Sequence, residues 1–287
     1  MKRYEKFVID TQKNINFDVS NEAYSGNYKK PPIPEMYHHV CGEWYNGFVI
    51  ERFSDKSQFV WIPVGSLPSN GTLYNISFNE KFGRRNYLNN VFSEAEYHEV
   101  VVDELSSQLT SVKKYGGFYI SRYNISKNSI TSKPQSTKGS TPWTNINFND
   151  AKEIARLMEC SNTLKSHLTF SSEYDSVLEW FIQSKAKTIE EIIINPRQCG
   201  NYQSVKNTDN YCIPLYRTGS HEEWCTNNIY DLAGNVSEWV QEQCGSYNRV
   251  IRGGNFLDPY IPISGRTYLC TTFRFINIGF RVALYIK

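Results

Sequence analysis

The segment that decides the fold is "NNIYDLAGNVSEWVQE", residues 227–242. Gly234 stands between Ala233 and Asn235, where a glycine allows a positive φ or a close approach of two backbones. Trp239 lies five residues further on, and we expect this large side chain to be a buried anchor. The segment therefore predicts a tight turn that leads directly into the core.

Two shorter segments follow, and each contains a feature typical of a fixed scaffold. "RVIRGGNF" (249–256) ends in the pair Gly253–Gly254, and "NIGFRVAL" (277–284) is a strand-like run. We expect Arg252 and Arg281 to donate hydrogen bonds to loop carbonyls, with contact to a ligand as the alternative role. The segments 249–256 and 277–284 therefore have the features of a fixed scaffold, whereas the chain between them is irregular.

That irregular stretch reads "NFLDPYIPISGRTYLCTTFRFIN", residues 255–277. It contains no His, Glu or Lys, and its one acidic residue is Asp258. Because these are the groups that most often transfer protons or bind metals, we do not expect acid–base catalysis here.

Composition narrows the classes of protein further. The 287 residues are 40% hydrophobic and 15% aromatic, which is a globular composition. A formal net charge of +2 does not suggest a nucleic-acid binder. No run approaches the ~20 apolar residues of a membrane span, and the N-terminus lacks a signal-length apolar run. The seven cysteines are scattered and form no CxxC pair, as in a protein with reduced thiols.

The rest of the chain predicts one α+β domain with much irregular structure. Residues 1–40 are a polar lead-in, and the domain is expected to run from 41 to 287. The runs at 59–66 and 116–126 predict strands. Two main helices are predicted, one capped by Asn147 with Asp150 and one capped by Ser172 with Asp175.

Taken in order, seven segments resemble the formylglycine-generating enzyme (sulfatase-modifying factor) family, which has a variant of the C-type lectin fold. They are the three segments quoted above from 227 onward together with "FVWIPVGS", "GGFYISRYNIS", "PWTNINFNDAKEIARLM" and "KSHLTFSSEYDSVLEW". The resemblance runs from about residue 57 to the C-terminus, and it implies that fold.

The resemblance does not extend to the family's copper-binding cysteine pair. At the positions that align with those two cysteines the chain has Asp258 and Ile263, and neither can act as a thiolate. We therefore expect no catalysis and no catalytic residue. The alternative is an oxidoreductase of the formylglycine-generating type, or another enzyme of the same fold.

The family also binds calcium near the turn at Gly234, and the resemblance implies a structural calcium site here. Asn235 and Glu238 are the candidate ligands, and Asn201 matches a second site. An ordinary capped turn with an acidic residue remains the alternative. Ser237 stands where the family usually has Trp, so the local packing must differ. No other cofactor is expected.

Some proteins with this fold are the variable proteins of diversity-generating retroelements, in which one C-terminal surface is randomised. In those systems the altered codons are mostly Asn codons whose adenines are replaced, and the resulting codons cannot encode Lys, Glu, Gln, Met or Trp. Residues 255–277 contain none of these five amino acids. The chain has 18 Lys and 20 Glu residues, so their absence from 23 positions is informative. Residues 255–277 are therefore a candidate diversified surface.

On this interpretation the C-terminal stretch binds a protein or cell-surface ligand of unknown identity, and the protein resides in the cytoplasm or on a phage particle. A plain structural loop is the competing interpretation, since "TYLCTTF" also resembles a buried strand. The ligand-binding residues that we predict are Phe256, Leu257, Asp258, Tyr260, Ile261, Ile263, Ser264, Tyr268, Thr271, Thr272, Phe273, Phe275 and Ile276.

Overall fold

The computed structural model describes most of the chain, and most of the predicted lead-in at residues 1–40 lies outside the described residues. The described residues are 31–43, 46–66, 102–194, 199–202, 215–258 and 260–287, with the short strands β1 (Phe17–Asp18), β6 (Ser77–Phe78), β7 (Lys81–Phe82) and β8 (Tyr97–Glu99). Among these residues, no helix has the length and apolar character that crossing a membrane requires.

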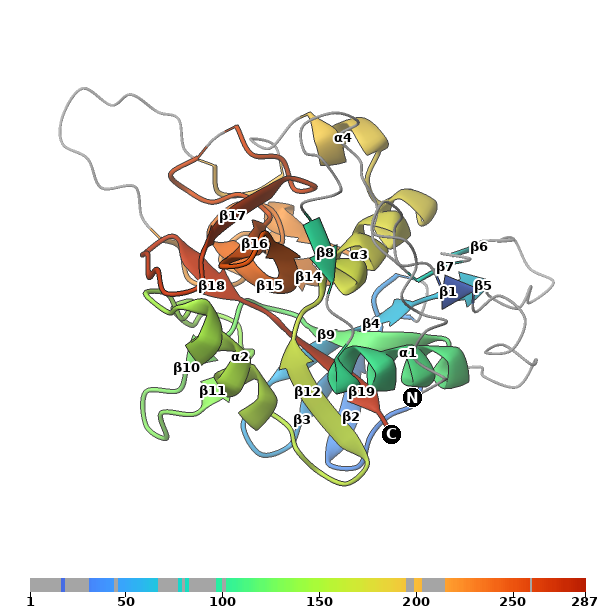
Figure 1. Ribbon diagram of the computed structural model, residues 1–287. Coiled ribbons are helices and arrows are strands. Elements are labelled where there is room, and N and C mark those ends of the chain that lie inside the picture. Colours follow the sequence, from blue (N-terminus) through green and yellow to red (C-terminus); the bar gives the residue numbers. More distant parts are fainter. Residues whose placement is uncertain are drawn as a thin grey trace.

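A six-stranded antiparallel sheet forms the lower layer of the molecule in Figure 1. Its strand order is β12 (Leu164–Leu168), β19 (Val282–Ile286), β9 (Gly117–Ser121), β4 (Gln58–Pro63), β3 (Val49–Arg52) and β2 (Tyr37–Cys41). The edge strand β2 begins four residues before the predicted domain boundary at residue 41. Strands β4 and β9 occupy the segments where the sequence predicts them.

Strand β4 is apolar on both faces because each face of the sheet is covered. Val60 and Ile62 pack in a cluster with residues of α1 (Asp103–Tyr115) and α3 (Ser171–Gln183). Phe59 and Trp61 alternate with them and pack in a second cluster with α2 (Phe148–Leu157). Successive side chains of a strand point to opposite faces, so burial on both sides produces a continuous apolar run.

A smaller sheet lies above the first and holds the C-terminal segments (Figure 1). Its order is β17 (Arg266–Cys270), β16 (Asn248–Arg252), β15 (Ser237–Cys244) and β18 (Ile278–Phe280), and β8 also pairs with β15. The pairing of β15 with β18 is parallel, whereas β16 is antiparallel to both neighbours. This sheet therefore brings together the segments that flank residues 255–277.

Three pairs of short strands complete the described strands, in addition to β1 with β7. They are β5 (Gly65–Ser66) with β6, β10 (Ser126–Lys127) with β11 (Pro134–Gln135), and β13 (Cys225–Thr226) with β14 (Ile229–Tyr230).

Both predicted helices are present, and the structure adds α1, the short α4 (Ile189–Ile193) and a 3₁₀ turn at Glu222–Trp224. In α2 the Asn147 side chain accepts a hydrogen bond from the Asp150 backbone N–H at 2.9 Å, as predicted. The predicted cap of α3 is wrong, because the carboxylate of Glu173 accepts the Phe170 N–H at 2.8 Å instead. Asp175 has a different role.

The two sheets share an aromatic core. Trp239 on β15 is fully buried, which confirms it as an anchor, and its indole N–H donates to the Ile146 carbonyl at 3.0 Å. Its ring packs edge-on against Phe148 at the start of α2, with 6.0 Å between ring centroids. The segment before α2 is thereby fixed to the smaller sheet.

A buried ion-pair network joins α3 to the smaller sheet. The Asp175 carboxylate accepts hydrogen bonds from Arg252 at 2.6 Å and from Arg266. The other side of Arg266 reaches the buried Glu242 on β15 at 3.0 Å. Arg252 and Arg266 face each other across β16 and β17, so one carboxylate holds both strands where the 253–265 loop leaves and returns.

We expect the Asp175→Ala variant to lose about 3 to 5 kcal/mol of unfolding free energy, because it leaves two buried guanidinium groups without this counter-charge. The measurement is equilibrium denaturation in urea. A matched control exists in Asp150, which pairs with Arg274 at 2.6 Å where both side chains are about half exposed. Asp150→Ala should cost less than about 1 kcal/mol. Similar losses in the two variants would contradict this account of the network.

Candidate ligand-binding surface

The entry to the 255–277 stretch requires two glycines. Gly253 and Gly254 have φ values of 85° and 66°, in the left-handed region. A Cβ on Gly253 would lie 2.6 Å from the Leu232 carbonyl oxygen, and one on Gly254 would lie 2.5 Å from that of Ile261. Any larger residue would therefore clash with backbone as well as being strained.

Both ends of the stretch are attached to one residue, Ser237, at the start of β15. The Asn255 side-chain amide donates to the Ser237 hydroxyl oxygen at 3.0 Å. The Ser237 backbone N–H donates to the Asn277 carbonyl at 2.9 Å. A Trp at this position could not provide that hydroxyl, so the departure from the family pattern has a structural use here.

The two flanking arginines have the structural role predicted for them. Arg252 is fully buried and donates to the carbonyls of Ser264 and Gly265 at 3.3 and 3.1 Å. Arg281 is also buried and donates to the carbonyls of Ser121 and Arg122 at 2.9 and 3.0 Å. Neither guanidinium is accessible to a ligand.

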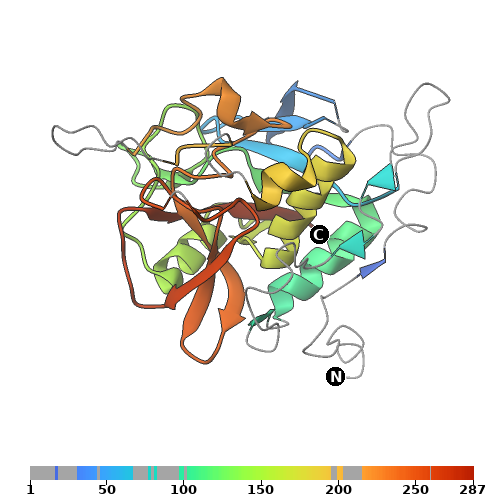
Figure 2. The same ribbon diagram turned by 90° about the horizontal axis from the view of Figure 1, so that it is seen from above.

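Most of the predicted ligand-binding residues lie at the surface. Six large side chains are 43–78% exposed, namely Leu257, Tyr260, Tyr268, Phe273, Phe275 and Ile276. Thr272 is exposed, and Asp258, Ile261 and Thr271 are half-buried. Figure 2 shows this part of the chain, in red and red-orange, on the opposite side of the molecule from α1.

Three of the predicted residues are buried, and this corrects the expectation that the whole set faces outward. Phe256 and Ile263 are 3% and 2% exposed. The Ser264 hydroxyl donates to the Ile192 carbonyl of α4 at 2.9 Å. These side chains belong to the scaffold, because they hold the stretch against the core and the neighbouring helix.

Sequence reasoning missed Tyr247, which lies outside the predicted window. It occupies the turn between β15 and β16, its side chain is 79% exposed, and its carbonyl accepts the Thr271 N–H at 3.2 Å. Its position next to Thr271 adds another aromatic group to the same end of the sheet. Residue spacing gives no sign of this proximity, since strand pairing creates it.

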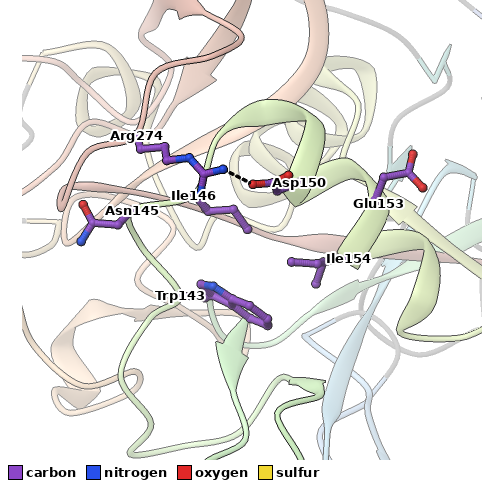
Figure 3. A pocket seen from close by; sticks show the side chains of 7 residues that line it. All are labelled: Trp143, Asn145, Ile146, Asp150, Glu153, Ile154 and Arg274. Carbon is purple, nitrogen blue, oxygen red and sulfur yellow. Dashed lines mark hydrogen bonds and ion pairs between the residues drawn. The ribbon is translucent and has the colours of Figure 1, made fainter.

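The sequence also gives no sign of a pocket beside the stretch. It has a volume of about 250 Å³ and is lined by Trp143, Asn145, Ile146, Asp150, Glu153, Ile154 and Arg274. Figure 3 shows the Arg274 and Asp150 side chains meeting along one side of it, with Trp143 on the opposite side. Of these seven residues, only Arg274 lies within 255–277.

The two residues predicted to stand at the family's cysteine positions are a carboxylate and an aliphatic side chain. The Asp258 carboxylate accepts the Tyr260 N–H at 3.1 Å, and Ile263 is in the core. The six described cysteines carry free thiols. Among them, Cys270 lies in the stretch, and hydrogen bonds from Thr272 and Thr271 lower the pKa of its thiol.

As placed, Asn235 and Glu238 do not fit a calcium site. The Asn235 side-chain oxygen accepts from the Asn201 amide and the Tyr216 N–H, each at 3.1 Å. One Glu238 oxygen accepts from Arg281 at 2.7 Å, so a cation already neutralises this carboxylate. Burial raises the pKa of Glu238 to about 7, despite the opposing effect of Arg281. Calcium takes about six to eight oxygen ligands, whereas here hydrogen-bond donors already occupy the Asn235 side-chain oxygen and one Glu238 oxygen.

The comparisons with known proteins establish the family. Residues 51–286 match the sulfatase-modifying factor enzyme 1-like domain, so the chain belongs to that family. The structure accordingly has the C-type lectin-like fold of the formylglycine-generating enzyme type, with few helices and mostly antiparallel sheets. Among curated proteins, none matches the chain at a significant level.

Three solved structures are similar to the chain at low identity. PvdO from Pseudomonas aeruginosa is 16% identical, with a TM-score of 0.47 over 83% of this chain and 97% of that one. CarF is 15% identical, with a TM-score of 0.44 over 60% and 87%. Treponema denticola variable protein 1 is 12% identical, with a TM-score of 0.43 over 87% and 99%. The family assignment rests on the domain match.

Two Phe→Ser variants test which side chains of the stretch lie at the surface and which belong to the core. Phe273→Ser should lower the unfolding free energy by less than about 1 kcal/mol, because the ring is half exposed and packs edge-on against the exposed Phe275. Phe256→Ser should cost about 3 to 5 kcal/mol as a large-to-small core change. Urea denaturation of both variants is the measurement. Equal losses would show that Phe273 is also part of the core.

Thermal melts test the remaining calcium question, because Glu238 keeps one buried carboxylate oxygen with no partner among the described residues. We expect curves in calcium and in chelator to superimpose. An ion that binds only the native state would add about 3 kcal/mol at a hundredfold excess over its dissociation constant. Such a rise, lost in Asn235→Ala, would restore the two residues as ligands.

Proposed function

We propose that this protein is a non-catalytic ligand-binding protein in which residues 255–277 form a diversified recognition surface on a C-type lectin-like scaffold. The observation that carries the proposal is the division within that stretch. Three of the side chains predicted to bind are buried and anchor it to the scaffold, whereas six large apolar side chains of the same stretch are exposed.

Exposed aromatic and aliphatic groups of this kind suit protein recognition. Soluble proteins rarely expose clustered large apolar side chains without a binding role, and aromatic residues dominate the binding energy of interfaces. A protein or cell-surface ligand is therefore the partner that we propose. A cytoplasmic or phage-associated location fits the same proposal.

The rigidity of the scaffold supports the proposal as well. The glycine turn, the Ser237 contacts and the Asp175 network all involve backbone or buried groups, and none depends on the exposed side chains. Exposed residues can therefore change while the backbone that presents them is retained. A diversified surface requires this separation of support from contact.

The gene provides the direct test. If residues 255–277 are diversified by a retroelement, a near-copy of their coding sequence and a reverse transcriptase gene should lie close by. Differences between the copies should fall at template adenines and concentrate on exposed positions such as Tyr260 and Phe273. They should spare the codons of Gly253, Gly254 and Arg266, because those residues hold the stretch in place. Sequencing the flanking DNA is the measurement.

Two outcomes would contradict the proposal. Without a template and a reverse transcriptase, the surface is fixed rather than diversified. If the purified protein with copper converts the cysteine of a sulfatase-type peptide to the aldehyde, the protein is an enzyme of the family's founding type. Mass spectrometry of the peptide measures that conversion, and an inactive result agrees with Asp258 and Ile263 at the cysteine positions.

A further inference from the structure

The pocket beside the stretch has an apolar floor. Ile146 is buried and Trp143 is half-buried, and Figure 3 shows Ile146 and Ile154 pointing into the space between Trp143 and the Arg274–Asp150 pair. The Lys127 ammonium group lies 5.4 Å from the centroid of the Trp143 ring. This ring therefore already contacts one cation of the chain through its π-system.

The opposite side of the pocket is acidic, and Asp150 is the group that faces it. Its carboxylate binds the Arg274 guanidinium at 2.6 Å, and this pair bridges α2 and the 271–277 loop (Figure 3). Glu153 also lines the pocket, but it pairs with Arg156 at 2.9 Å and its carboxylate points away from Asp150 in Figure 3. Asp150 is thus the carboxylate available to a cation in the pocket.

The Arg274–Asp150 pair can be replaced by another cation. The two side chains are 54% and 46% exposed, and ion pairs in solvent contribute little to stability. An arginine with its charge on Asp150 shows which chemistry the pocket accepts. A cation with an aliphatic stem would satisfy both the acidic side and the apolar floor.

We propose that this pocket is a subsite for a lysine or arginine side chain of a protein ligand, with the stem against Trp143 and Ile154 and the charge on Asp150 in place of Arg274. The inference rests on the proposed function, because Arg274 belongs to the stretch that we propose is diversified. The other six lining residues lie outside it. Residue 274 therefore controls access to a pocket that every version of the surface shares.

A larger neighbouring hollow suits a basic side chain less well. It has a volume of about 680 Å³ and shares Trp143 and Ile154 with the smaller pocket. Its one lining carboxylate, Asp55, is bound by Arg52 at 2.6 Å, and that arginine also reaches Glu159. Charge complementarity thus favours the smaller pocket.

The test is a titration of the full chain, labelled with ¹⁵N in its six tryptophan indoles, with Nα-acetyl-arginine methylamide. We expect a saturable NMR shift of the Trp143 resonance, assigned with Trp143→Phe, while the other five indoles serve as internal references. Nα-acetyl-citrulline methylamide, which is neutral and of similar shape, should produce no saturable shift.

Variants identify the groups involved. Arg274→Ser should bind the arginine probe about two- to threefold more tightly, because it removes an exposed internal competitor. Asp150→Asn should bind about tenfold more weakly, because a hydrogen bond to a charged group is lost. Glu43→Gln, an exposed carboxylate that does not line the pocket, is the matched control and should leave binding unchanged.

Three results would overturn the subsite. They are equal shifts with arginine and citrulline, unchanged affinity in Asp150→Asn, and the lack of saturation in Arg274→Ser. These binding results do not depend on the flanking DNA. If a template is found there and the titration fails, only the proposal of a subsite in the pocket is refuted. Conversely, binding of the probe without a template would refute diversification and leave the subsite on a fixed surface.

Discussion

The shared carboxylate of Asp175 is the interaction on which the C-terminal half of the structure depends. Arg252 ends β16 and Arg266 begins β17, and the loop between them carries Tyr260. Buried charges are costly unless they are paired, so this arrangement tolerates very few alternative positions of the two strands. The loop is therefore rigidly anchored even though its own sequence is irregular.

Arg266 therefore belongs both to the 255–277 stretch and to the buried ion-pair network. By sequence it lies inside the stretch that we propose is diversified, yet its guanidinium joins Asp175 and Glu242, which belong to α3 and β15. The stretch is consequently two loops with a fixed strand between them. Only the exposed side chains of the loops and that of Tyr268 are free to change without loss of the sheet.

The sequence predicted those parts of the fold that have local signals. The cap at Asn147 and the apolar run of β4 depend on near neighbours, and Trp239 has few roles other than a core one. Arg252 and Arg281 were predictable because buried loop carbonyls need donors near glycine turns.

Burial within residues 255–277 had no such signal. Phe256 and Phe273 are the same residue type in equally irregular sequence, and long-range packing alone makes one core and the other surface. The pocket was equally hidden, because Asp150 and Arg274 are 124 residues apart in the chain. The sequence suggested that Asp175 caps a helix, because its actual partners, Arg252 and Arg266, lie on other elements and are distant in the chain.

The attachment of Asn255 and Asn277 to Ser237 has a consequence for loop length. Since the scaffold brings the two ends together, the chain between them can grow at small entropic cost, about 0.6 kcal/mol for each doubling of a flexible loop. Residues inserted near Tyr260 or Thr272 would extend a loop tip and leave β17 in register. The fold can therefore accommodate protruding or recessed surfaces by insertion and deletion, which an exchange of side chains alone would not create.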